Sequence, residues 1–258
     1  MFDLEEISFA KLRIGWGRTG NNRVGDYTAY SQLDATPSSG YVWGTKQNYQ
    51  PGVYQNNLGV PDLRWETTAQ TNVGLDLGFF NQKLEATIDY YRKETTDLLL
   101  NANMAPHTGF NKVQQNVGAV QNQGLEFSLN STNINTEKFK WTTSFNIAFN
   151  KNKTLRLNSG ENAIYTDPEW KQLNEFQYIT QVGQPVGMMF GLQFDGICQL
   201  EDFNWDNASS TYELKAGVPD NGASVAPGSM KFIDQNGDGT INNDDRVIIG
   251  NPNPDHFG

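Results

Sequence analysis

The chain has 258 residues, of which 37% are hydrophobic and 19% are charged, and its formal net charge is -10. This acidic balance, with a pI near 4.7, argues against nucleic acid as a partner, because binding to its phosphate backbone requires clustered lysine and arginine. The mean hydropathy of -0.60 and the lack of any apolar run of about 20 residues exclude a helical membrane protein. They leave open an outer-membrane β-barrel, because its strands alternate apolar and polar residues.

Residues 9–157 contain five segments in which apolar and polar residues alternate. In the second segment, Val73, Leu75 and Leu77 alternate with asparagine, glycine and aspartate. A period of two predicts strands with one apolar face, since successive side chains of a strand point to opposite sides. The predicted strands span residues 9–18, 65–80, 83–101, 123–135 and 139–157.

The connections between these predicted strands alternate between long and short. The short ones, at 81–82 and 136–138, have hairpin length, whereas 19–64 and 102–122 are long. Short turns at one end and long loops at the other are typical of an outer-membrane barrel. A soluble β-sandwich would show the same alternation, but these strands are long for one. We therefore predict an all-β fold, an antiparallel meander that forms part of a large outer-membrane barrel with long extracellular loops.

Strand parity predicts which side chains face lipid and which face the lumen. The first set is apolar and the second is polar and mostly small. We expect lipid contact for Val73, Leu75, Leu77, Phe79, Leu125, Phe127, Leu129, Phe145, Ile147 and Phe149. We expect a luminal position for Asn72, Asp76, Glu126, Ser144 and Asn146. Aromatic residues near strand ends are candidates for interfacial girdles, namely Phe79, Phe80, Tyr90, Tyr91, Phe139 and Trp141.

After the fifth segment, no comparably clean membrane strand follows. Strand 139–157 begins at the short turn 136–138, which should lie on the periplasmic side, so the strand should end on the extracellular side. We therefore expect residues 1–258 to form one partial barrel domain. Within it, residues 9–157 should form membrane strands with their loops, and residues 158–257 one long extracellular excursion.

Residues 234–245 have the spacing of a calcium loop. Oxygen-bearing side chains occupy positions 1, 3 and 5, glycine occupies position 6, an apolar residue position 8 and a carboxylate position 12. The predicted ligands of one structural Ca²⁺ are Asp234, Asn236, Asp238, the Thr240 carbonyl, Asn242 and Asp245. The alternative is a loop of Asx turns that only bends the chain. Its flanks, 229–233 and 246–249, are β-branched and apolar, so we expect strands there and a bracing role, unlike the helices of a switching EF-hand.

No other motif indicates catalysis. The chain lacks a Gly-x-Ser-x-Gly elbow, a phosphate-binding glycine loop and a His-Glu-x-x-His zinc motif, so we expect no enzyme. Aromatic residues after position 158 are candidates to stack on sugar rings, although packing within the loops is the simpler role for each. These substrate-contact candidates are Tyr165, Trp170, Tyr178, Trp205 and Tyr212.

A series of short motifs, in this order along the chain, resembles the C-terminal barrel of the SusC/RagA family of TonB-linked outer-membrane transporters. The resemblance runs nearly from end to end. The motifs lie at 57–59, 63–66, 70–76, 89–99, 116–118, 122–126, 182–187, 234–239 and 249–254.

The resemblance implies a TonB-driven importer of oligosaccharides or peptides in the outer membrane of a Gram-negative bacterium. It also implies a SusD-like surface lipoprotein as partner and contact with outer-membrane lipid. The family's signal peptide, TonB-binding segment and plug have no counterpart in these residues, so we expect this chain to be part of a barrel, with TonB acting through those absent N-terminal parts. The alternatives are a soluble, calcium-braced β-domain that binds glycans at the cell surface and, less favoured, a hydrolase built on such a domain.

Overall fold

A computed structural model describes residues 7–22, 25–45, 47–110, 112–157, 162–166, 177–222, 225–254 and 256–257. The chain divides into two compact units. Unit 1 comprises residues 1–162 and 255–258, and unit 2 comprises residues 163–254. Within the described ranges, no helix is both long enough and apolar enough to cross a membrane.

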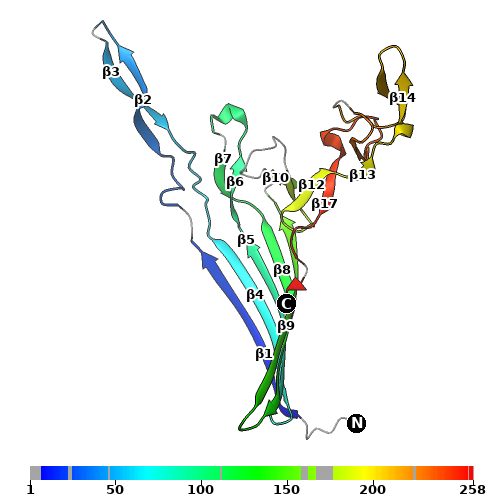
Figure 1. Ribbon diagram of the computed structural model, residues 1–258. Helices are drawn as coiled ribbons and strands as arrows, with labels where there is room; N and C mark the ends of the chain where they lie inside the picture. Colours follow the sequence, from blue (N-terminus) through cyan, green and yellow to red (C-terminus); the bar gives the residue numbers. More distant parts are fainter. Residues whose placement is uncertain are drawn as a thin grey trace. The chain divides into compact units, whose positions relative to one another are not determined.

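Unit 1 is built on one antiparallel sheet of six strands (Figure 1). The strands in spatial order are β1 (Ile7–Asn21), β4 (Glu66–Phe79), β5 (Leu84–Thr96), β8 (Ala119–Asn135), β9 (Lys140–Arg156) and β18 (His256–Phe257). The first five of these strands lie side by side in the same order in which they follow one another along the chain. The predicted meander is therefore confirmed. β18 adds a sixth strand that pairs with β9 through His256 and Phe149, so the excursion predicted over residues 158–257 was too long at its end.

The third predicted strand, 83–101, was too long. β5 ends at Thr96 because Asp97 adopts a left-handed backbone with φ of 57°, which interrupts the ladder. The chain then forms a separate hairpin from β6 (Leu99–Asn103) and β7 (Lys112–Asn116), which holds a single-turn 3₁₀ helix at Pro106–Thr108. The Asn116 side chain donates to the Asp97 carbonyl oxygen over 2.8 Å and so fixes this break.

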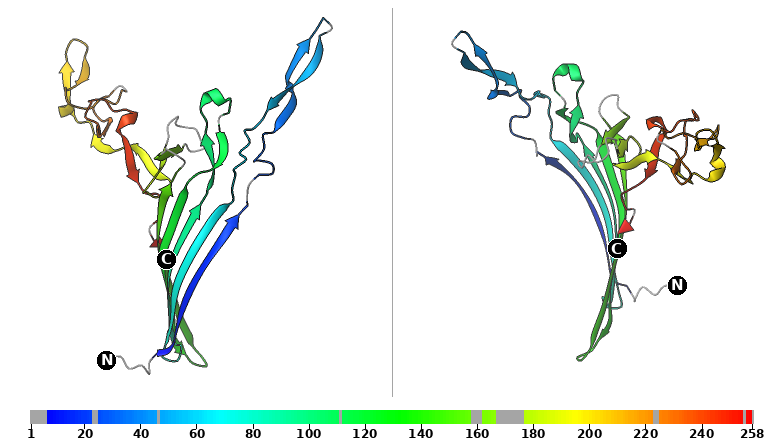
Figure 2. Two further views of the ribbon diagram at one scale, coloured as in Figure 1. Left: turned by 180° about the vertical axis from the view of Figure 1, so that it is seen from behind. Right: turned by 45° about the horizontal axis from the view of Figure 1, so that its top comes forward.

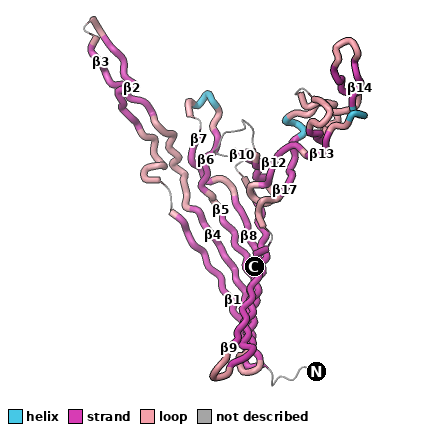
Figure 3. Tube along the Cα trace, in the orientation of Figure 1, coloured by secondary structure: helices cyan, strands magenta, loops and turns pink. Residues whose placement is uncertain are grey.

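Short turns lie at one end of the sheet and long connections at the other (Figures 2 and 3). In the turn between β4 and β5, Phe80, Asn81 and Gln82 all have positive φ values, of 53°, 53° and 63°. The turn between β8 and β9 is closed by Thr136, whose amide donates to the Phe139 carbonyl over 2.8 Å. The long connection between β1 and β4 contains a hairpin of β2 (Leu33–Trp43) and β3 (Asn48–Gln55).

The register of the sheet separates its side chains into two faces. Residues directly opposite one another in a ladder point to the same side. One such row is apolar and consists of Leu12, Leu75, Ile88, Phe127 and Ile147. The next row, on the other face, consists of Arg13, Gly74, Asp89, Glu126 and Ala148. Parity in the sequence therefore predicted both faces.

The apolar face is not buried by the rest of unit 1. Leu12, Ile14 and Trp16 are 64%, 73% and 73% exposed. The buried apolar side chains of this unit gather instead at the end with the long connections, at Val113, Val117, Ala119 and Leu157. An exposed apolar stripe along a whole sheet face is costly in water, so another apolar medium must cover it.

Unit 2 consists of short strands and loops. A four-stranded sheet has the order β10 (Ala163–Thr166), β11 (Tyr178–Gln181), β12 (Met188–Leu192) and β17 (Arg246–Gly250). Two antiparallel pairs accompany it, β13 (Phe194–Ile197) with β16 (Met230–Phe232) and the hairpin of β14 (Phe203–Asp206) with β15 (Thr211–Leu214). Single-turn 3₁₀ helices occur at Leu200–Asp202 and Asn243–Asp245. Ile179, Met188, Cys198, Phe203 and Ile241 are buried.

Candidate functional site

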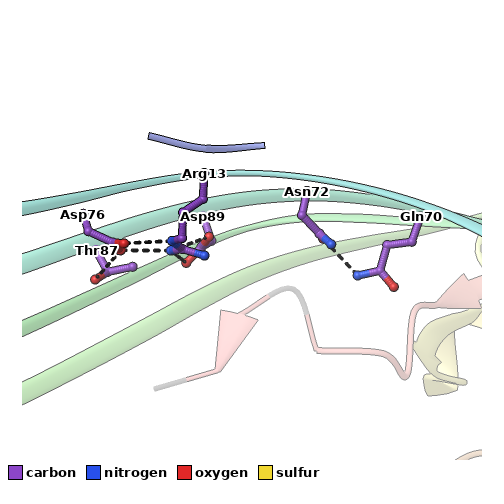
Figure 4. Close-up of polar contacts among 6 residues, drawn as sticks. All are labelled: Arg13, Gln70, Asn72, Asp76, Thr87 and Asp89. Atoms are coloured by element: carbon purple, nitrogen blue, oxygen red, sulfur yellow. Dashed lines mark hydrogen bonds and ion pairs between the residues drawn. The ribbon is translucent and has the colours of Figure 1, made fainter. Parts of the chain in front are cut away.

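An ion-pair network crosses the polar face of the six-stranded sheet (Figure 4). Arg13 on β1 donates from Nε to Asp76 Oδ2 over 2.8 Å and from Nη2 to Asp76 Oδ1 over 2.9 Å. The same Nη2 donates to Asp89 Oδ2 on β5 over 3.0 Å, and the Thr87 hydroxyl donates to Asp76 Oδ1 over 3.2 Å. Figure 4 shows these side chains on the same side of the sheet as Gln70 and Asn72, with the strands arching over them.

Gly74 makes this network possible. It lies between Arg13 and Asp89 in the row across β1, β4 and β5. A Cβ atom at this position would overlap the Asp89 carboxylate and lie 2.7 Å from Arg13 Cζ. Glycine therefore lets two side chains bond directly over the backbone of the strand between them.

Gly124 plays the same role one step further around the sheet. It separates Tyr91 on β5 from Asn150 on β9, and the Tyr91 hydroxyl donates to Asn150 Oδ1 over 2.9 Å. A Cβ at Gly124 would lie 2.6 Å from Tyr91 Cε1. Tyr91 therefore points to the polar face, and its assignment to an interfacial girdle was wrong. Tyr90 has the opposite parity and remains on the apolar face.

A polar hollow of about 460 Å³ lies on this face beside the network. Its lining residues are Arg13, Gln70, Asn72, Asp89, Tyr91, Lys93 and Glu126. Two of the predicted luminal residues, Asn72 and Glu126, are among them. The sequence alone did not indicate Arg13 as a site residue. Its polar parity between Leu12 and Ile14 was visible in the sequence, but its position opposite Gly74 follows only from the register of the sheet.

The predicted calcium loop forms a compact set of backbone-to-side-chain hydrogen bonds. Asp234 accepts from the amides of Gly237 and Gly239 over 2.6 and 2.7 Å. Asn236 accepts from Asp238, and Asp238 in turn accepts from Thr240, both over 2.8 Å. Gly237 and Gly239 have φ of 75° and 83°, values that suit glycine. The first three oxygen-bearing side chains are therefore turned into the loop.

Asp245 closes the loop at position 12. Its side chain is fully buried and accepts from the amides of Asn242 and Gln235 over 2.8 and 2.9 Å. The pKa of the Asp245 carboxyl lies below its usual value, mainly because the Asn242 amide donates a hydrogen bond to the carboxylate. Asn242, at position 9, accepts from the Asp244 amide over 2.7 Å.

The flanks of this loop are strands, as predicted. β16 precedes it and β17 follows it, and Asp220 pairs with Thr240 in a short parallel bridge. Among the residues that the structure describes, no three His, Cys, Asp or Glu side chains converge as a metal-binding group. The donor chemistry nevertheless fits a hard cation, because carboxylate and amide oxygens retain lone pairs beyond these hydrogen bonds.

The aromatic substrate candidates fall into separate places in unit 2. Trp205 and Tyr212 face each other across the β14–β15 hairpin, with ring centroids 5.0 Å apart, and are 51% and 44% exposed. Tyr165 packs on Phe190 with centroids 5.3 Å apart. Tyr178 is half-buried on β11. Trp170 lies outside the described residues.

A curved antiparallel sheet with one uncovered apolar face and one polar face is typical of the wall of an outer-membrane β-barrel protein. The chain matches the family described as "TonB dependent receptor-like, beta-barrel" over residues 5–247 and therefore belongs to it.

Relatives agree with this assignment. TonB-dependent receptor P3 of Formosa agariphila is 33% identical over 253 residues, which cover 98% of this chain and 24% of the relative. TonB-dependent receptor SusC of Bacteroides thetaiotaomicron is 31% identical over 255 residues, which cover 97% of this chain and 23% of the relative. The chain thus spans about a quarter of the length of the curated relatives it matches.

A solved structure titled "Structure of the RagAB peptide transporter" shares the fold. It aligns with a TM-score of 0.64 and 24% sequence identity, over 89% of this chain and 24% of that one. The family resides in the outer membrane of Gram-negative bacteria, so the predicted location is confirmed. TonB-dependent receptors are transporters and not enzymes, in agreement with the expectation of no enzyme.

Location in an outer membrane assigns the two faces of the sheet. The uncovered apolar face meets lipid, and the face that carries the Arg13 network meets the lumen.

Replacement of Leu75 by Arg in the full-length receptor should therefore destabilise the folded barrel by about 2 to 4 kcal/mol. Asn146→Arg, on the other face of the same sheet, should have a small effect. Urea unfolding in lipid vesicles measures both, and equal losses for the two variants would contradict the assignment.

The alternation of connections predicts which end of the sheet is outside. Single cysteines at Ala105, Asn81 and Glu137 in the full-length receptor test it, with the buried Cys198 replaced by serine. A membrane-impermeant maleimide should label position 105 on intact cells and positions 81 and 137 only after lysis. Labelling of position 81 on intact cells would reverse the orientation.

Proposed function

We propose that this chain supplies wall strands and outer loops to a TonB-dependent importer of oligosaccharides or peptides. The observation that carries the proposal is the sheet of unit 1, with its lipid-facing apolar side and its polar, hollowed luminal side, in a chain of the TonB-dependent receptor family. A polar wall with fixed charges suits the passage of hydrophilic solutes.

The two substrate classes have different support. The fold neighbour is named as a peptide transporter, which favours peptides. The SusC/RagA motifs and the similarity to SusC along nearly the whole chain support the importer family, and that resemblance implies oligosaccharides or peptides alike. In either case the proposed partners are a SusD-like surface lipoprotein at the outer end and TonB at the inner end. TonB would act through segments other than the strands described above.

Trp205 and Tyr212 are the proposed substrate contacts in unit 2. They present exposed aromatic surface from neighbouring strands of one hairpin, and the Trp205 indole N–H is held by Asn207 Oδ1 over 3.0 Å. Aromatic faces bind the C–H faces of sugars and the side chains of peptides. The other candidates have weaker support, since Tyr165 packs on Phe190, Tyr178 is half-buried on β11 and Trp170 lies outside the described residues.

We also propose that the loop 234–245 holds one structural Ca²⁺. Asp234, Asn236, Asp238, the Thr240 carbonyl, Asn242 and Asp245 would provide its hard oxygen ligands. When bound, the ion would neutralise carboxylates that lie close together in a loop of a chain with net negative charge. The strands on both sides favour a bracing role for the ion.

Import is tested in the native organism with the full-length receptor. Its deletion should abolish growth on at least one oligosaccharide or peptide mixture, and deletion of the neighbouring lipoprotein should do the same. Trp205→Ala should lower uptake at limiting substrate by about fivefold, the loss expected for about 1 kcal/mol of aromatic contact. Trp205→Phe, which keeps an aromatic face, is the matched control. Normal uptake of both solute classes without the receptor would refute the importer assignment.

Calcium binding is tested by limited proteolysis of the full-length receptor. Chelation should expose 234–245 to cleavage, and Asp238→Ala should produce the same sensitivity with calcium present. Asp244→Ala removes a carboxylate at a position that the spacing does not assign to the ion, so this variant should behave like the native receptor. If Asp238→Ala leaves both protease resistance and calcium binding unchanged, the loop is only a turn.

A further inference from the structure

The lipid-facing side of the sheet changes character abruptly along the strands. Four successive rows are largely apolar, from the row of Phe79 and Leu84 to the row of Val73, Tyr90 and Leu125. Two residues further toward the long connections, the facing row consists of Trp16, Thr71, Arg92, Gln123 and Lys151. The row after that consists of Arg18, Ala69, Glu94, Gln121 and Lys153.

These two rows form a basic margin, which we define by Arg18, Arg92, Lys151 and Lys153. All four are exposed. The acidic residue in these rows is Glu94, whose Oε2 lies 3.8 Å from Arg92 Nη2, a long and exposed pair that neutralises little. The margin therefore carries a net charge of about three positive units on the outside of an otherwise acidic chain.

The opposite border of the apolar face has no such margin. The last lipid-facing row toward the short turns consists of Ile7, Phe79, Leu84, Ser131 and Thr143, none of which is charged. The charged residues Lys83, Glu137 and Lys138 at this end lie in the turns themselves. The distance between the two borders covers most of the apolar band of about 25 Å that is typical of outer-membrane barrels. Eight residues separate Phe79 from Thr71, which corresponds to about 26 Å along a strand and about 20 Å of height for a tilt near 40°.

A hollow of about 390 Å³ lies where the apolar rows meet the basic margin. Tyr90, Leu125 and Phe149 line it on the apolar side, and Gln123 and Lys151 line it on the polar side. Arg92 and Lys151 flank Gln123 in the same row, two strands apart, which places their backbones about 10 Å from each other. Lys151 lines the hollow, whereas Arg92 lies beside it with Nη2 3.8 Å from Glu94 Oε2. Rotation of the Arg92 side chain from Glu94 toward Lys151 would let both cations contact one anionic group above the hollow.

We propose that the hollow and the basic margin bind one phosphorylated lipid of the outer leaflet. The upper part of an acyl chain would pack on Tyr90, Leu125 and Phe149, and the phosphate would lie between Arg92 and Lys151. The charge is complementary, and the order of apolar and basic groups along the strand matches the order of chain and headgroup in a lipid. The inference depends on the outer-membrane location and on the orientation of the sheet, and not on which solute is imported.

The test measures retention of monophosphorylated lipid A by the purified full-length receptor, using native mass spectrometry in a neutral detergent. The native receptor should retain the lipid, and the double variant R92Q/K151Q should bind it about 30-fold more weakly, at about fivefold for each cation lost. The charge-conserving variant R92K/K151R should bind nearly as well as the native protein, which excludes misfolding as the cause.

The matched control is K93Q, because Lys93 is the neighbour of Arg92 and faces the lumen. It should retain the lipid fully. The same lipid without its phosphate should be retained weakly by all variants. Equal retention by R92Q/K151Q and the native receptor, or equal retention of the dephosphorylated lipid, would overturn the proposal. Displacement by inorganic phosphate at the same concentration would also overturn it, since the site would then be one for the free anion.

Discussion

Backbone hydrogen bonding in an apolar medium is the constraint on which the rest of this structure depends. Lipid supplies no donors or acceptors, so each strand that crosses it must pair with neighbours along its whole length. β4, β5 and β8 do this on both sides, with 13 consecutive register pairs between β4 and β5 and again between β5 and β8. The long strands, the tight turns and the uncovered apolar face are all consequences of that ladder.

The alternation of side chains made much of unit 1 predictable. A period of two is a local property, so the strands, their antiparallel order and their two faces could be inferred without any knowledge of long-range contacts. The end of β5 could not, because the left-handed backbone of Asp97 leaves no mark on hydrophobic periodicity. Tyr91 was misassigned for a related reason, since an aromatic residue near a strand end was considered without regard to its parity.

The candidate sites differ in how far the sequence could define them. The hydrogen bonds of the loop 234–245 join residues within 11 positions of each other, so a spacing pattern was sufficient to predict which side chains gather there. The Arg13 network joins residues 63 and 76 positions apart and depends on the register across a long connection. In unit 2, Trp205 and Tyr212 come together because they share a hairpin, whereas Tyr165 packs on Phe190, a residue that the composition of the loop does not indicate.

The glycines at positions 74 and 124 solve a problem that alternation alone leaves open. A slip of one residue between two strands would turn apolar side chains away from lipid and is strongly disfavoured. A slip of two residues keeps every side chain on its own face, so the bilayer cannot distinguish it from the native pairing. Such a slip would place Arg13 opposite Asn72 or Asp76, whose Cβ atoms occupy the space above the strand. The open space above Gly74 and Gly124 therefore favours the native register over registers shifted by two residues, in which the same side chains would still face lipid.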